Sequence, residues 1–306
     1  MVVMKEKSVL FKSILWLFVL SFFQSNAQQD PLFTQYMYNM NIINPAYAGS
    51  VEAAEFGLNT RAQWVNFEGS PKTLTFAFSS PVPMLENFGM GLSLVSDISG
   101  PLTNQDIYLD FSYQLQIHST GALSLGLKAG NTLSFFDNSY FTDDPAYGGI
   151  ENSNHWNVGA GLYYQDRSIY VSLSVPQIFN YEQELGSELN SINRQVYLSA
   201  GYVYTLERYL QIKPSMLVRY SENEPVSFDL NTNLLWYETF ETGVSYRYNS
   251  SVSLLFNMKV MENLRVGYSF DYGIGPMMGS NATSHEIFLL YDLQSKRQRF
   301  TSPRFF

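Results

Sequence analysis

Along most of this sequence, apolar and polar side chains alternate with a period of two residues. In residues 54–64, Phe56 and Leu58 belong to a mostly apolar set, whereas Glu55, Asn59 and Arg61 lie at the positions between them. The same alternation occupies residues 107–117 and 228–236. Because successive side chains of a β-strand point to opposite faces, each segment is predicted to be a strand with one apolar and one polar face.

Such segments recur down to residue 293, and each is about eight to eleven residues long, the length of a tilted membrane strand. The predicted strands lie near residues 54–64, 72–80, 89–96, 106–117, 121–132, 155–164, 168–175, 194–204, 209–220, 226–236, 239–248, 251–260, 263–272 and 284–293. An even number of strands returns both chain ends to one side of a barrel. The sequence therefore predicts an all-β fold, a transmembrane antiparallel β-barrel of about 14 strands.

A soluble antiparallel sandwich is the alternative, because its strands also alternate and one of its faces is also polar. Three features favour the barrel. The predicted strands are longer than usual, their number is high for one sandwich, and aromatic side chains gather toward their ends as in a membrane girdle. The chain has 22 Tyr and 23 Phe but only 15% charged residues, which is compatible with a lipid-facing surface.

The connections between the predicted strands differ in length. The odd-numbered ones include the long segments 133–154, 176–193 and 273–283, whereas the even-numbered ones are mostly tight and polar. Segment 81–88 is an intermediate exception, and the odd connections at 221–225 and 249–250 are short. Outer-membrane barrels have short periplasmic turns and longer outward loops, so the three long segments are expected to face outward.

The N-terminus has the order of a secretory signal. Lys5, Lys7 and Lys12 precede an apolar run at residues 14–23, and Ser25-Asn26-Ala27 follows it. A retained membrane anchor is disfavoured because the run is short and the residues after Ala27 are polar. We therefore expect a cleaved signal peptide at 1–27, an N-terminal periplasmic or plug-like segment at 28–52, the barrel at 53–294 and a C-terminal tail at 295–306.

Residues 28–50 lack strand alternation and are rich in aromatic and Met side chains. Residues 34–40 are predicted to form a short helix, which Asn44-Pro45 ends because the residue before proline avoids the helical region. These side chains need burial, and we expect it at the periplasmic mouth of the barrel, in its lumen or against a partner.

The polar faces of the strands predict a lumen with charges of both signs. The lumen-facing candidates are Arg61, Lys128, Arg219, Asp229, Arg247, Lys259, Arg265, Asp271 and Glu286, although Leu290 shares the parity of Glu286. Small residues recur on the same side, as at Gly126 and Gly161, and leave space for bulkier neighbours or a plug. We expect these charges to pair and fill the barrel; a conducting or ligand-binding pore is the alternative.

Several chemistries are disfavoured. There is no Cys, which excludes disulfides and thiolate sites, and the net charge of -9 argues against a nucleic-acid partner. His118, His155 and His285 are scattered, and His285-Glu286 lacks the second histidine of a zinc-protease motif. No G-x-S-x-G elbow occurs. We therefore expect no catalytic residues, no metal site and no cofactor, and a protein that is not an enzyme.

Two motifs follow the expected signal peptide: D-P-x-[FY]-[ST]-Q-Y at 30–36 and N-P-A-Y-A-G at 44–49. With these motifs the sequence resembles the PorP/SprF family of type IX secretion and gliding-associated outer-membrane proteins. The likeness continues at 88–92, 97–101, 125–130, 174–176, 213–215, 243–247, 268–272, 285–287 and 302–306. The motif positions are structural or interaction candidates: Asp30, Pro31, Phe33, Gln35, Tyr36, Asn44, Pro45, Ala46, Tyr47 and Gly49.

This resemblance implies an integral protein of the cell outer membrane in Bacteroidota, in contact with outer-membrane lipid. It further implies that the protein binds exported surface proteins, through their C-terminal sorting domains and its own outward loops, or anchors periplasmic components of the type IX machinery. The family has no agreed catalytic residues to carry over. A general or substrate-selective porin remains the alternative function.

Overall fold

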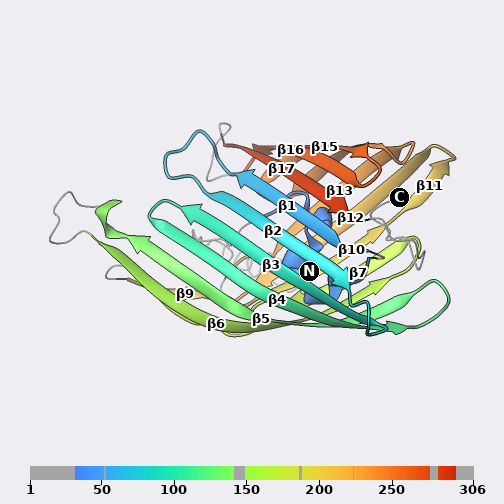
Figure 1. The fold of residues 1–306 in the computed structure, drawn as a ribbon. Helices are drawn as coiled ribbons and strands as arrows, with labels where there is room; N and C mark the ends of the chain where they lie inside the picture. The colour runs from blue at the N-terminus through green and yellow to red at the C-terminus, as the bar shows by residue number, and fades with distance from the viewer. Residues whose placement is uncertain are drawn as a thin grey trace, which may run out of the picture.

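The computed structural model describes residues 32–51, 53–140, 149–185, 188–222, 224–275 and 282–293, and shows a closed antiparallel barrel of 14 strands (Figure 1). The barrel segments are β1 (Glu55–Ala62), β2 (Lys72–Pro81), β3 (Phe88–Ser99), β4 (Leu102–Gln116), β5 (Ala122–Asp137), β6 (Ile150–Gln165), β7 (Ile169–Val175), β10 (Gln195–Tyr202), β11 (Tyr204–Glu207), β12 (Leu210–Ser221), β13 (Ser227–Trp236), β14 (Phe240–Arg247), β15 (Ser251–Met261), β16 (Leu264–Gly273) and β17 (Thr283–Asp292).

Each strand pairs with its neighbours in the sequence, and two further ladders close the ring. β1 pairs with β17, and β7 pairs with β10, which in turn pairs with β12. β10 and β11 both lie along β12 and together act as one barrel strand interrupted at Val203. The predicted number of strands is therefore confirmed, and no edge is left open along the barrel wall.

The two ends of the barrel differ. We call the end that carries residues 54 and 293 the turn end, and the opposite end the loop end. At the loop end, β5 and β6 extend farthest (Figure 1). Both ends of the segment 133–154, predicted as a loop, are therefore strand, since β5 continues to Asp137 and β6 begins at Ile150. Polar residues at consecutive positions, such as Glu151 and Asn152, conceal this strand from a periodicity rule.

The predicted loop 176–193 also contains structure of its own. β8 (Tyr181–Leu185) and β9 (Glu188–Ile192) pair as a separate two-stranded sheet, which we call the outer hairpin. Its first residue, Tyr181, stacks on His155 of β6 with ring centroids 4.3 Å apart. A short 3-10 helix, η3 (Asn138–Tyr140), follows β5. The loop end is thus a folded surface and not a set of simple connections.

The outer face of the barrel is apolar and the inner face is polar, as the alternation predicts. Leu230 on β13 is 52% exposed, whereas its neighbour Asn231 is 3% exposed and faces the lumen. Exposed aromatics lie near both ends of the outer wall, with Tyr113 and Phe240 toward the turn end and Tyr248 and Tyr272 toward the loop end. Among the described residues, no helix is long and apolar enough to span a membrane.

Residues 32–51 lie inside the barrel, and we call them the plug (Figure 1). The plug consists of η1 (Tyr36–Tyr38), α2 (Met40–Ile43) and η2 (Pro45–Tyr47). It therefore has three short helical segments where one helix at 34–40 was predicted, and α2 does end at Asn44-Pro45. The Asn44 side chain caps η2 by accepting a hydrogen bond from the Ala46 amide at 2.9 Å. The hydrophobic core of the protein is the contact between the plug and the inner wall.

Candidate functional site

The lumen is the candidate site, because charged side chains of the wall converge there on the backbone of the plug. Arg61 of β1 lies 2.6 Å from Asp271 of β16 and 3.0 Å from Glu286 of β17. Glu286 accepts hydrogen bonds from the backbone amides of Thr34, at 2.8 Å, and Gln35, at 3.1 Å. One cation and two carboxylates therefore fix the first described turn of the plug.

Lys128 and Asp110 hold the middle of the plug. The Lys128 ammonium lies 3.4 Å from the Asp110 carboxylate and donates to the carbonyl oxygen of Ile42 at 2.9 Å. The Asn41 side-chain amide donates to the other Asp110 oxygen at 3.2 Å. The C-terminal end of α2 therefore has a cation against its free carbonyl groups, where the partial negative charge of a helix lies.

Two further ion pairs contact the plug from β12 to β14. Lys213 lies 2.7 Å from Glu241, which also accepts the Tyr38 hydroxyl at 2.8 Å. Arg247 forms a two-pronged pair with Asp229, at 2.9 and 2.8 Å, and donates to the carbonyl oxygen of Phe33 at 3.3 Å. Together these make four ion-pair clusters, and each one reaches the plug.

Burial of these charges has a clear energetic meaning. The side chains of Glu286, Asp110 and Glu241 have no exposed surface, and a charge so far from water is costly unless it is paired and hydrogen-bonded. Removing one partner of such a pair costs about 3 to 5 kcal/mol, because the other charge stays buried. The charges of these four clusters therefore pair with one another and hold the plug.

Glycines let the plug lie directly against β5 and β6. A Cβ atom at Gly126 would lie 2.1 Å from the Ala46 nitrogen, and one at Gly161 would lie 2.0 Å from the Asn44 side-chain oxygen. Asn44 also donates to the Leu162 carbonyl at 2.9 Å and to the Ser172 hydroxyl at 2.7 Å. The small residues of the inner wall thus leave space for the plug, which is one of the two roles expected for them.

Most of the motif candidates lie in the plug. Phe33, Gln35, Tyr36, Asn44, Pro45, Ala46 and Tyr47 are buried against the wall, and Gly49 is half-buried with a φ of 67°. Asp30 and Pro31 lie outside the described residues, as do the signal peptide and the tail. The opening motif, as far as it is described, therefore makes contacts within the protein.

The charged candidates are placed less uniformly. Arg61, Lys128, Arg219, Asp229, Arg247, Arg265, Asp271 and Glu286 are all buried on the inner face. Lys259 pairs with Arg265 in the strand ladder and shares its inward face, but its side chain is exposed because it lies at the turn end, beyond the plug. Arg265 lies over the Tyr38 ring, with its guanidinium carbon 5.9 Å from the ring centroid.

Inward-facing apolar residues were missed by the sequence analysis. Leu235, Leu255, Phe288 and Leu290 point into the lumen and are almost fully buried, and Phe288 stacks on Tyr38 with ring centroids 4.5 Å apart. They break the polar parity of their strands. Leu290, which shares the parity of Glu286, was the one such residue noted in the sequence. An apolar side chain that points into the lumen indicates a filled lumen, because it is buried from water only if another segment packs against it.

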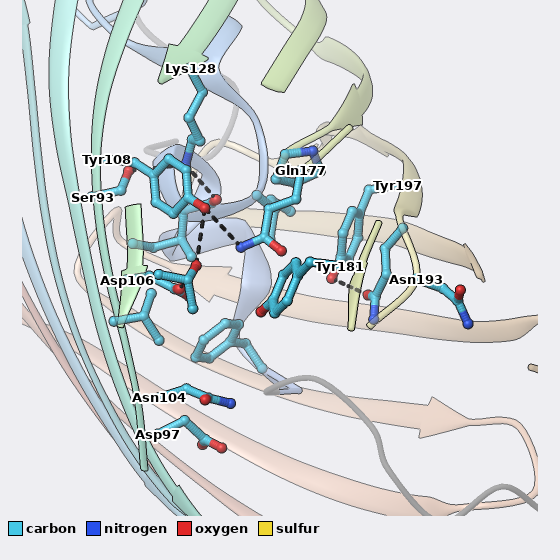
Figure 2. Close-up of a pocket in the computed structure, with 17 residues that line it drawn as sticks. Ser93, Asp97, Asn104, Asp106, Tyr108, Lys128, Gln177, Tyr181, Asn193 and Tyr197 are labelled. Carbon is cyan, nitrogen blue, oxygen red and sulfur yellow. Dashed lines mark hydrogen bonds between the residues drawn. The ribbon is translucent and has the colours of Figure 1, made fainter. Parts of the chain in front are cut away.

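Above the plug, toward the loop end, lies a cavity of about 100 Å³, which we call the vestibule (Figure 2). The plug forms part of its lining through Phe33, Ile42 and Ile43, while β3, β4, β5, the segment after β7, the outer hairpin and β10 contribute the rest. In the described part of the chain, no group of three or more His, Cys, Asp or Glu side chains is arranged to hold a metal ion.

Comparisons with known proteins agree on fold and family. A family model described as type IX secretion system membrane protein PorP/SprF matches residues 25–291. No curated protein matches the sequence. Similar solved structures include the CymD monoaromatic hydrocarbon channel (11% identity, TM-score 0.50, 85% of this chain and 94% of that one) and the Ralstonia pickettii toluene transporter TbuX (9% identity, TM-score 0.49, 82% and 92%). At these identities the likeness shows the fold alone. Family and fold together place this chain in the outer membrane.

Proposed function

Because the chain belongs to the PorP/SprF family of type IX secretion system membrane proteins, we propose that it is a closed, non-catalytic scaffold of the type IX secretion and gliding machinery. In this proposal the loop end faces the cell exterior and binds or anchors an exported surface protein through its C-terminal sorting domain. The turn end faces the periplasm and contacts components of the machinery.

The filled lumen is the observation that carries the proposal. Four ion-pair clusters hold the plug, and Gly126 and Gly161 admit it to backbone contact with the wall. A porin needs a continuous aqueous path, whereas a scaffold needs a rigid body with two accessible ends. The structured loop end, with its long strands and outer hairpin, supports a binding surface on that side.

Planar-bilayer recording of the purified protein separates this proposal from the porin. We expect no steady open-channel current from the wild type. A variant lacking residues 32–51 serves as the positive control, because removing the plug should open the lumen and produce a current. A steady current from the wild-type protein would support the porin and overturn the scaffold.

Gentle extraction from native membranes tests for the partners. We expect an exported surface protein and periplasmic machinery components to co-purify with the wild type. Replacing the outer hairpin, residues 181–192, with a short Gly-Ser linker should release the exported protein but retain the periplasmic components. Recovery of the barrel alone from the wild-type membranes would count against the proposal.

A further inference from the structure

We propose that the vestibule is a binding site for an organic cation, namely a guanidinium or primary ammonium head group. Two carboxylates on the barrel wall, Asp97 of β3 and Asp106 of β4, line this cavity together with aromatic rings of the plug, the wall and the outer hairpin. In Figure 2, Asp97, Asn104 and Asp106 lie on one side of the cavity, and Tyr181 and Tyr197 lie on the other.

The two carboxylates have hydrogen bonds but no cation. A Thr73 hydroxyl donates to Asp97 at 2.5 Å, and a Thr132 hydroxyl donates to Asp106 at 2.5 Å. Within the described ranges, neither carboxylate forms an ion pair. Both side chains are only half-buried, so solvent or a ligand can reach them. Each carboxylate therefore has accepting capacity left for a donor that carries a positive charge.

Lys128 also lines this cavity, but its ammonium group is already occupied by other partners. It pairs with Asp110 at 3.4 Å and donates to the carbonyl oxygen of Ile42 at 2.9 Å and to the Ser93 hydroxyl at 3.2 Å. An ammonium group has three donors, and these contacts use them. Lys128 also attracts Asp106 electrostatically, but within the described residues it forms an ion pair with neither Asp106 nor Asp97.

A chain of hydrogen bonds fixes the orientation of Asp106. The Gln177 amide donates to the Tyr108 hydroxyl at 3.2 Å, and the Tyr108 and Thr132 hydroxyls lie 3.1 Å apart. Because Thr132 uses its proton on Asp106, Tyr108 must donate to Thr132, so all the donors in this chain point toward the carboxylate. A preorganised carboxylate binds a cation without first losing rotational freedom of its own side chain.

The aromatic walls favour an organic cation over a bare metal ion. Phe33, Tyr108, Tyr181 and Tyr197 line the same cavity, and the faces of such rings attract guanidinium and ammonium groups. A volume of about 100 Å³ is the space of roughly three water molecules, which suits a planar head group. The head group belongs either to an Arg or Lys side chain of an exported polypeptide or to a free polyamine. The polypeptide source rests on the proposed function, whereas the binding chemistry does not.

Isothermal titration calorimetry on the full-length protein in detergent micelles tests the site. The probes are Nα-acetyl-arginine amide and its uncharged isostere Nα-acetyl-citrulline amide. We expect saturable binding of the arginine probe only, and about tenfold or weaker affinity in Asp97→Asn, Asp106→Asn and their double variant. Glu86→Gln, an exposed change at the turn end with the same loss of charge, should bind like the wild type.

Several outcomes would overturn the proposal. Equal binding of the arginine and citrulline probes would show that charge is not recognised. Unchanged affinity in the Asp97 and Asp106 double variant, with the barrel still folded by heat-modifiable gel mobility, would place any binding elsewhere. Calcium binding that the double variant abolishes, without any arginine binding, would identify a metal site instead.

A second pair of probes identifies the source of the cation. Tighter binding of a Gly-Arg-Gly amide peptide than of spermidine supports the site with a polypeptide ligand, and the reverse supports it with a free polyamine. The test is independent of partner recovery. If no exported protein co-purifies while the arginine probe binds, the proposed function fails and the cation site stands.

Discussion

The plugged part of the lumen and the vestibule above it use inward-facing carboxylates of the barrel wall in opposite ways. Around the plug, Asp110, Asp229, Glu241, Asp271 and Glu286 each have a basic partner within 3.4 Å. At the vestibule, Asp97 of β3 and Asp106 of β4 accept hydrogen bonds only from hydroxyl donors. Matched charges hold a segment in place, whereas unmatched charges leave a surface that can still bind.

Packing shows the same contrast. The plug lies so close to the wall that a single methyl group at Gly126 would overlap the Ala46 backbone. At the loop end, a Cβ atom at Gly149 would meet no atom of the described residues within 4 Å. The filled region therefore behaves as a protein core, and the loop end has the properties of a binding surface.

The largest expected effect comes from breaking a cluster that holds the plug. Arg61→Leu leaves Asp271 and Glu286 buried without their cation, so the free energy of unfolding should fall by about 3 to 5 kcal/mol. Urea unfolding in lipid vesicles measures it. Arg194→Leu, an exposed arginine at the loop end, is the matched control and should change stability by less than about 0.5 kcal/mol. Equal losses in both variants would remove the distinction between the two regions.

The sequence predicted the barrel because its signal is local. The alternation at Leu230 and Asn231 depends only on which face of one strand meets lipid. The number of strands, and the face on which each side chain lies, can therefore be predicted from short stretches of sequence. The partners of the plug were not predictable in this way. Thr34 contacts Asp271, and Asn44 contacts Leu162, and nothing in a single sequence states which of many polar wall residues a short irregular segment will meet.

The vestibule was harder still to foresee. Its carboxylates lie on β3 and β4, its amide donor Gln177 follows β7, and Tyr197 lies on β10. These residues meet only after the barrel closes and the outer hairpin folds over it. The hairpin itself, in a segment predicted as a loop, is short and polar, and its apolar period is too brief to distinguish it from a connection.

A second prediction disrupts the contact between plug and wall by adding side-chain volume instead of removing a charge. Gly126→Val places side-chain atoms where the Ala46 backbone lies, and overpacking of this kind costs about 1 to 3 kcal/mol. If the added side chain displaces the plug and not the barrel wall, the variant should also show intermittent current in planar bilayers. Gly149→Ala, which meets no neighbour, should match the wild type in stability and in conductance. A Gly126→Val variant that conducts no current and is as stable as the wild type would show that the plug is held less tightly than its contacts indicate.

A third prediction removes one uncharged anchor of the plug. Asn44→Ala deletes the cap of η2 and leaves the Leu162 carbonyl and the Ser172 hydroxyl without their buried donor. We expect a loss of about 1 to 3 kcal/mol in the free energy of unfolding. Asn193→Ala, at the vestibule, should cost less, since Asn193 is half-buried and donates to the exposed Glu222 carbonyl. A larger loss at Asn193 would reverse the assignment of core and surface.

The smallest effect is expected where the charges are unmatched. Asp106→Asn keeps an oxygen that accepts from Thr132 but removes a negative charge on the same side of the cavity as Asp97, where neither carboxylate forms an ion pair within the described residues. Its stability should therefore change by less than about 1 kcal/mol, because no buried partner is left uncompensated. The same substitution at Asp110, which pairs with Lys128, should cost several times more, because the Lys128 ammonium then stays buried without a counter-charge. Urea unfolding of the two variants side by side measures the contrast, and similar losses would mean that Asp106 has a cation partner within the folded protein.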